Sequence, residues 1–172
     1  WARGAAVALA GWTKFAALLL APLWLSYPDG IRSSVRRFAL GFVAATAAAF
    51  LVLLLEPDPL HAVRVFAERT FGFQIGRESP FSLWGWGQYR AAGVPDLHVV
   101  QQVLQVLVLA GAALVAFVPR RKSVLQLAAL TGAVLISFEV VLTHWFYLYI
   151  PWFFPFLALA VLSSRARVPP VH

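Results

Sequence analysis

The residues best suited to chemistry lie in one polar stretch near the middle of the chain. Between positions 69 and 85 this stretch carries two guanidinium groups, an amide and two serine hydroxyls, on Arg69, Arg77, Gln74, Ser79 and Ser82. A guanidinium binds phosphate through two parallel hydrogen bonds, and amide and hydroxyl groups bind sugar hydroxyls. Trp84 and Trp86 supply flat faces that can stack on a sugar ring. A loop at the membrane interface, where Arg meets lipid phosphates and Trp anchors the headgroup level, explains the same composition.

A second polar site lies in the aromatic stretch from Thr143 to Trp152. His144 is the only group in this stretch whose charge changes near neutral pH, so it can bind a phosphate or carry a proton. Pro151 and Pro155 bend or interrupt the start of the helix expected there. An aromatic belt at the membrane face with one incidental histidine is the alternative interpretation.

Lys14 lies near the middle of an otherwise apolar segment. A lysine at the centre of a bilayer costs about 2.5–3.5 kcal/mol on insertion scales, so such a residue usually faces a cavity or a partner. If the helix begins later, the same side chain reaches the interface by extending along the apolar surface. We include Lys14 among the candidate substrate-binding residues.

Other polar residues recur inside apolar segments. His98, Gln101, Gln102 and Gln105 follow one another at spacings that place them along one side of a helix. Glutamine side chains hydrogen-bond helix to helix in membrane proteins, which is the role expected of this stripe. Glu139 is a single carboxylate near the end of another apolar segment.

Several classes of protein are disfavoured by what the sequence lacks. It has no cysteine, no phosphate-binding loop, no GxSxG motif, no metal-ligand cluster and no dinucleotide fingerprint. We therefore expect neither a metal nor a cofactor. The net charge of +7 comes from arginines in short gaps between apolar blocks, not from a basic face with interleaved aromatics. That distribution predicts no nucleic-acid partner.

The elements that must position these residues are apolar helices. The chain is 61% hydrophobic and 12% charged, whereas a soluble domain carries about 25% charged residues. The apolar residues form blocks of about 20, the length that crosses a bilayer as a helix. We predict an all-α, polytopic transmembrane bundle of about five spans, forming a single domain over residues 1–172. The predicted spans are Ala5–Ser26, Phe38–Leu55, Val99–Val118, Ser123–Leu142 and Tyr147–Leu162.

The short loops predict the orientation of this bundle in the cell membrane. Basic residues concentrate in Tyr27–Arg37, in Pro119–Lys122 and in the tail, at Arg165 and Arg167. Five crossings put these three sites on one side, which the positive-inside rule identifies as cytoplasmic. The C-terminus is then cytoplasmic and the N-terminus extracytoplasmic.

The long connection Glu56–Leu97 is predicted to be an extracytoplasmic loop, on the same side as the turn at His144. Its residues Leu60–Phe71 have an apolar and a polar face. Such a helix lies in the membrane interface with its apolar face toward the lipid.

Three segments resemble bacterial membrane glycosyltransferases of the C-type superfamily, near the polyprenyl-phosphate-mannose-dependent mannosyltransferases. Phe66–Thr70, Gln74 and Arg77–Gly85 resemble the large extracytoplasmic loop of these enzymes. His144–Pro155 resembles their late aromatic helix start. Gly11–Leu23, with its lysine followed by a proline, resembles an earlier helix.

This resemblance implies an activity and a set of partners. The donor would be a polyprenyl-phosphate-linked sugar, mannose or a similar hexose or pentose, and the acceptor a lipid or a glycan. Transfer would take place at the extracytoplasmic face. The resemblance also implies an acidic base in the first extracytoplasmic loop. The sequence begins at Trp1 and contains no methionine, so we expect a C-terminal fragment of a longer protein whose catalytic base lies upstream of Trp1.

The same resemblance implies roles for the candidate residues. Those that would neutralise the lipid phosphate are Arg69, Arg77 and His144. Those that would bind the sugar or the acceptor are Gln74, Ser79, Ser82 and Tyr147. Preorganised donors of this kind stabilise the negative charge of a phosphate leaving group.

Two other functions fit the same composition. A membrane transporter or flippase component would bind the same lipid phosphates without chemistry. A non-catalytic membrane subunit would use the polar residues for packing alone.

Overall fold

The computed structural model describes residues 1–72, 82, 84, 97–143 and 147–165. Within these ranges the regular elements are all helical and no strand occurs. The predicted all-α class is therefore confirmed.

The first apolar segment folds as a helical hairpin. Helix α1 covers Ala2–Thr13, and the chain turns at Lys14, whose extended backbone (φ −149°, ψ 110°) ends the helix. It returns through a 3-10 helix, η1, over Phe15–Leu20 and through α2 over Ala21–Ser26. The predicted interruption at Lys14 is thus a reversal of chain direction.

The two ends of this hairpin lie together, which contradicts the predicted single crossing over Ala5–Ser26. The Arg3 guanidinium donates a hydrogen bond to the backbone oxygen of Tyr27. The N-terminus and the loop that begins at Tyr27 therefore share one end of the molecule, although the sequence placed them on opposite sides. The reversal is possible because Gly11 has no Cβ, which would overlap the Leu18 side chain where η1 folds back onto α1.

Helix α3 covers Ile31–Phe50 and continues as a 3-10 helix, η2, over Leu51–Leu55. Its 25 residues form the one helix in the described part of the chain that is long and apolar enough to cross a membrane. It follows Gly30, whose φ of 98° is a conformation that glycine adopts without strain. This helix begins at Ile31, before the start of the predicted second span, Phe38–Leu55. The difference arises because arginine is a good helix former, so the helix continues through the arginines that precede the apolar block.

Helix α1 packs closely against α3 through two glycines. A Cβ on Gly4 would overlap the backbone oxygen of Phe38, and a Cβ on Gly41 would overlap that of Trp1. Small residues allow the backbones of membrane helices to approach in this way. The pair is one of the most extensive helix contacts in the molecule.

Helix α4 covers Pro59–Ala67 and continues as a π-helix, η3, over Glu68–Gly72. The Asp58 side chain caps it by accepting a hydrogen bond from the backbone nitrogen of His61 at 3.0 Å. These elements confirm the helix predicted over Leu60–Phe71.

In the described part of the chain three further α-helices follow η3. Helix α6 covers His98–Leu114 and α7 covers Val124–Val140, with Ser123 forming a capping box at its start. A short 3-10 helix, η5, over Tyr147–Tyr149 leads into α8 over Ile150–Arg165. At 16 or 17 residues these helices are roughly 24–26 Å long, below the roughly 30 Å of a bilayer core. The three predicted helices are confirmed. Five crossings are not, because the α3–η2 helix alone, among the residues that the structure describes, is long and apolar enough to cross a membrane.

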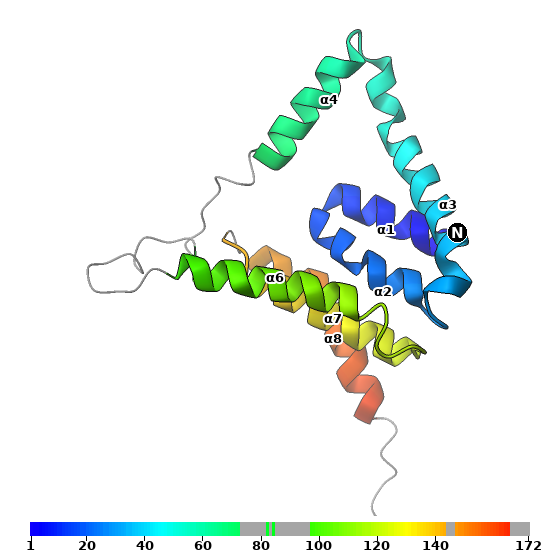
Figure 1. Cartoon of the computed structure of the whole chain (residues 1–172), viewed down its shortest axis with the longest axis vertical. Coiled ribbons are helices and arrows are strands. Elements are labelled where there is room, and N and C mark those ends of the chain that lie inside the picture. Colours follow the sequence, from blue (N-terminus) through cyan, green and yellow to red (C-terminus); the bar gives the residue numbers. More distant parts are fainter. Residues whose placement is uncertain (73–81, 83, 85–96, 144–146, 166–172) are drawn as a thin grey trace, which may run out of the picture.

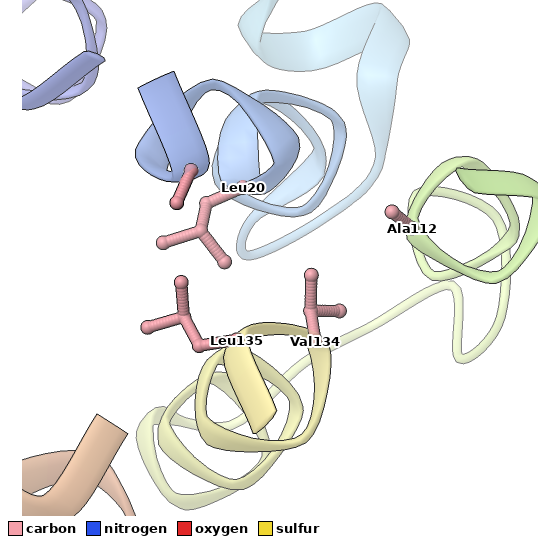
Figure 2. Close-up of a cluster of buried hydrophobic side chains, with 5 residues drawn as sticks. Leu20, Ala112, Val134 and Leu135 are labelled. Carbon is pink, nitrogen blue, oxygen red and sulfur yellow. The ribbon is translucent and has the colours of Figure 1, made fainter. Parts of the chain in front are cut away.

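A buried apolar cluster joins the hairpin to α6 and α7. It contains Ala16 and Leu20 of η1, Ala112 of α6, and Val134 and Leu135 of α7. Figure 2 shows the labelled side chains converging from the three elements. Their burial removes apolar surface from solvent and holds the N-terminal and C-terminal parts of the chain together.

The helices form a bundle in which α3 packs on α1 and α4 extends away from the end of α3. Figure 1 shows α1, α2, α6 and α7 lying side by side, whereas α3 and α4 form a V whose apex is the turn between them. Trp24 of α2 strengthens the bundle by donating from Nε1 to Thr131 Oγ1 of α7 at 3.2 Å.

Two basic loops meet at one end of the bundle. The backbone nitrogen of Lys122 donates to the carbonyl oxygen of Pro28 at 2.9 Å. Lys122 Nζ donates to the carbonyl oxygen of Pro119 at 2.7 Å, and Arg121 Nε lies 4.0 Å from Asp29 Oδ1. The loops predicted to share one side of the membrane therefore share one end of the molecule.

Candidate functional site

A pocket opens at the other end of the hairpin, where the chain turns at Lys14. Its volume is about 390 Å³, and it lies where the tip of the hairpin meets α4 with η3, the end of α7 and the start of α8. We call it the Lys14 pocket. The residues that line it are Trp12, Thr13, Lys14, Phe15, Ala16, Phe66, Thr70, Phe138, Leu142, Tyr149 and Trp152.

The ammonium of Lys14 faces an aromatic floor. Its Nζ lies 5.4 Å from the centre of the Trp152 ring, within the range of a cation–π interaction. Tyr149 stacks on Trp152 with ring centres 4.4 Å apart and an interplanar angle of 28°. The Lys14 ammonium makes no hydrogen bond or ion pair with any residue in the described ranges. Its three N–H donors are therefore available to an anion that enters the pocket.

One wall of the pocket is a chain of edge-to-face aromatic contacts. The rings of Trp12 and Phe50 lie 4.7 Å apart at 88°, and those of Phe50 and Phe66 lie 5.2 Å apart at 87°. Trp12 Nε1 donates to Thr46 Oγ1 at 2.9 Å, which satisfies the indole and fixes its orientation. This wall connects α1, α3 and α4.

Behind the wall lies a second pocket of about 310 Å³. It shares Trp12, Thr13 and Phe66 with the Lys14 pocket, so the two cavities adjoin. Its remaining lining residues are all apolar: Leu9, Ala49, Phe50, Val52 and Leu53. A cation in one cavity and an apolar cavity beside it suit a molecule with a charged head and a hydrocarbon tail.

The structure places some of the predicted site residues and not others. Lys14 lines the pocket, and Tyr147 belongs to η5 beside the aromatic floor. Arg69 is solvent-exposed in η3, next to Thr70, which lines the pocket. Four predicted residues lie outside the described ranges: Gln74, Arg77, Ser79 and His144.

Ser82, the remaining predicted residue, holds part of the long loop against the end of α7. Its Oγ donates to the carbonyl oxygen of Leu142 at 2.7 Å, and Trp84 Nε1 donates to that of Val140 at 2.8 Å. Carbonyl groups at a helix C-terminus lack partners within the helix, so these donors satisfy them. Because Leu142 lines the Lys14 pocket, the loop is attached at the pocket rim.

The predicted glutamine stripe also binds the end of α7. Gln101 Nε2 and Gln105 Nε2 donate to the carbonyl oxygen of Val141 at 3.0 Å and 3.1 Å. The expected helix-to-helix role is confirmed for these two residues. Gln102 instead hydrogen-bonds His98 one turn earlier on the same helix, at 3.0 Å.

Sequence reasoning did not select the aromatic residues that build the pocket. Trp12, Phe66, Tyr149 and Trp152 were not proposed as site residues, although each lies in a segment that carries the glycosyltransferase resemblance. An aromatic residue in an apolar segment gives no local sign of whether it faces lipid or a cavity. The lysine was the available signal, because an isolated cation in such a segment needs a polar or aromatic partner.

The chemistry of the pocket favours an anionic ligand over a metal ion. The described part of the chain contains no group of three His, Cys, Asp or Glu residues able to hold a metal ion. The pocket instead offers one ammonium group, the hydroxyls of Thr13 and Thr70, and aromatic faces.

Comparison of the chain with known protein families, with curated proteins and with solved structures finds no match. The resemblance to membrane glycosyltransferases therefore stays a prediction that rests on residues of this sequence.

Proposed function

We propose that the chain is a multi-pass protein of the cell membrane and part of a glycosyltransferase. It would transfer mannose, or a similar hexose or pentose, from a polyprenyl-phosphate donor to a lipid or glycan acceptor at the extracytoplasmic face. One observation supports this most strongly: the three segments with the resemblance meet around one pocket. Gly11–Leu23 contributes the ammonium, Phe66–Thr70 a wall, and His144–Pro155 the aromatic floor.

The surface and the charge distribution support membrane insertion beyond the single long helix. Large apolar side chains are exposed along α3, α6 and α8, including Leu40, Val103, Leu107 and Leu159. Extended exposed apolar surface indicates contact with lipid or a partner. The basic loops gather at the end opposite the Lys14 pocket, which favours a cytoplasmic position for those loops and the C-terminus. The N-terminus goes with them, and the pocket then faces outward.

In the proposed complex Lys14 binds the phosphate of the donor, and the sugar lies against the aromatic floor of Tyr149 and Trp152. The prenyl chain occupies the apolar pocket behind Trp12 and Phe66. The acceptor oxygen bonds to the anomeric carbon while the bond from that carbon to the phosphate oxygen breaks, and the phosphate leaves with the electron pair. The Lys14 ammonium stabilises this charge, and the acceptor proton passes to the acidic base that the resemblance implies.

Binding of a labelled polyprenyl phosphate to the protein in detergent micelles tests this assignment. Lys14→Gln should weaken binding by roughly 10- to 100-fold, because a hydrogen bond to a charged group contributes about 1.5–3 kcal/mol. The uncharged polyprenyl alcohol should bind wild type and variant equally. Arg64→Gln, at an exposed position on α4, is the matched charge control. Equal affinity of wild type and Lys14→Gln for the phosphate would refute the assignment of Lys14.

Sugar transfer from the same donor, measured in membranes, tests the activity itself. Transfer that is lost in Lys14→Gln and kept in Arg64→Gln supports a glycosyltransferase. The transfer assay uses the full-length protein, which would supply the acidic base. Tight binding of the donor by that protein with no transfer would instead support the transporter or flippase alternative.

A further inference from the structure

The end of the molecule remote from the Lys14 pocket carries a second concentration of positive charge. The loops from Tyr27 to Arg37 and from Pro119 to Lys122 hold six basic residues and one acidic residue, Asp29. Five of the basic side chains are exposed, and we call them the basic end: Arg32, Arg36, Arg37, Arg120 and Arg121.

These arginines come from two loops that are far apart in the sequence, and folding brings them together on one surface. The two loops are joined by the hydrogen bond from the Lys122 backbone nitrogen to the Pro28 oxygen at 2.9 Å. Beside it, a Cβ on Gly30 would lie 3.9 Å from the carbonyl oxygen of Arg120, so the two backbones are neighbours. Arg32 lies two residues after Gly30, in the first turn of α3.

The arginines of the basic end are available to a ligand. Apart from the contact between Arg121 and Asp29, their guanidinium groups make no ion pair or hydrogen bond with residues that the structure describes. Lys122 differs, because it is 4% exposed and its Nζ donates to the carbonyl oxygens of Pro119 and Ala116. The basic end is thus a surface of exposed guanidinium groups, whereas the neighbouring Lys122 ammonium is already hydrogen-bonded within its own loop.

Exposed apolar side chains flank these arginines. Val35 lies between Arg32 and Arg36 on α3 and is 44% exposed, and Val118, just before the second loop, is 63% exposed. A free anion gains nothing from such neighbours, whereas a phospholipid places acyl chains beside its phosphate. We propose that the basic end binds the headgroup of an anionic phospholipid, with arginines of both loops on its phosphate. This proposal does not depend on the glycosyltransferase function.

Titration of the protein, in micelles of an uncharged detergent, with fluorescent phosphatidylglycerol tests the proposal. Wild type should bind one molecule tightly and bind phosphatidylcholine more weakly. Replacing either pair, Arg36 with Arg37 or Arg120 with Arg121, by Gln should weaken that one site about thirtyfold, at about fivefold for each arginine lost near a lipid phosphate. Arg64→Gln is the control for net charge and should change nothing.

Three results would overturn the proposal. Equal affinity for the two lipids would show that the site does not distinguish an anionic headgroup from a zwitterionic one, in which the choline ammonium balances the phosphate. A second such result is that wild type binds two lipids, and each double variant loses one of them and keeps the other at unchanged affinity. That result would show two separate sites and not a shared one. Displacement of the lipid by excess inorganic phosphate would show a site for free anions.

A variant that is expected to tighten lipid binding makes the test independent of folding defects. Asp29 competes with the lipid phosphate for Arg121, 4.0 Å away. Asp29→Asn should therefore tighten phosphatidylglycerol binding about fivefold, by the value of one charge near the lipid phosphate. Unchanged or weaker binding in a variant with wild-type thermal stability would contradict the placement of the headgroup at Arg121.

Discussion

The two lysines of the chain, Lys14 and Lys122, have opposite surroundings at opposite ends of the helix bundle. Lys122 is 4% exposed, and its Nζ donates to the carbonyl oxygens of Pro119 at 2.7 Å and Ala116 at 3.4 Å. Lys14 is exposed, and its Nζ faces the ring of Trp152 without a hydrogen bond to a described residue. The Lys122 ammonium stabilises its loop through hydrogen bonds, whereas the N–H donors of Lys14 are available to a ligand.

This difference shows that the position of a lysine in the sequence does not reveal its role. Lys14 interrupts an apolar segment and has the sequence context of a buried charge, yet the hairpin exposes it at a turn. Lys122 lies in an arginine-rich loop and has the context of a solvated charge, yet the loop folds around it. The carbonyl oxygens of Ala116 and Pro119, in the segment that follows α6, accept hydrogen bonds from the second lysine and hold it inward.

The largest expected effect comes from separating the hairpin that carries Lys14 from α3. Gly4→Val should destabilise the protein by about 3 kcal/mol, because the new side chain overlaps the backbone of Phe38 and overpacking of this kind is poorly relieved. Thermal unfolding in detergent measures this change. Gly111→Ala on α6, where nothing lies within 4 Å of the added Cβ, should be neutral or slightly stabilising. Equal losses in both variants would show that α1 does not depend on close approach to α3.

The next largest effect should distinguish the two lysines directly. Lys122→Met should lower the free energy of unfolding by about 1–2 kcal/mol, because two loop carbonyls lose their donor. Lys14→Met should change stability by less than about 0.5 kcal/mol, as expected of an exposed side chain. Chemical denaturation of the two variants side by side gives both values. A larger loss for Lys14→Met would reverse the roles that we assign.

Removing the Trp152 ring from the aromatic floor should have a smaller effect on ligand affinity than removing the charge of Lys14. Trp152→Leu takes away the ring that faces Lys14 and stacks on Tyr149. Affinity for polyprenyl phosphate should fall about two- to fivefold, the equivalent of the 0.5–1 kcal/mol of an exposed cation–π contact. Trp1→Leu, at a residue 78% exposed, is the control in the same binding assay. Unchanged affinity in Trp152→Leu would mean that the floor does not position the ammonium.

The smallest effect concerns pH. Burial lowers the pKa of Lys122 from its ordinary value of 10.5. Above the folded-state pKa the unfolded chain binds more protons than the folded one, so stability should rise with pH until about 10.5 and then level off. The melting temperature of wild type should therefore rise relative to that of Lys122→Met as the pH approaches 10.5. A difference that is independent of pH would show that Lys122 is as well solvated in the folded protein as in the unfolded chain.

Helices were predictable from this sequence, but the path of the chain between them was not. Apolar runs identify α3, α6, α7 and α8, because a helix satisfies its own backbone wherever water is excluded. The same hydrophobicity hides the reversal at Lys14, since a long apolar run looks alike whether it crosses once or turns back. The reversal depends on Leu18 packing against Gly11 and on Arg3 reaching Tyr27, both of which are contacts between separate parts of the chain.

The candidate site was predictable only in part, for a related reason. Lys14 was identified because a cation in an apolar segment needs a partner. Its neighbours Phe66 and Trp152 come from segments far along the chain, and no local pattern pairs them with position 14. The candidates Arg77 and His144 lie outside the described ranges, so their roles stay predictions.

The hydrogen bond from Trp24 to Thr131 has a consequence for biosynthesis. The two residues are 107 positions apart, and chains are made at about 5–20 residues per second. Trp24 therefore waits roughly 5–20 s before its acceptor is made, and Lys14 waits longer still for Trp152. During that delay the glycine contacts between α1 and α3 are already available, so the N-terminal hairpin can assemble early on the ribosome-bound chain. The binding cavity would then be among the last features of the molecule to form.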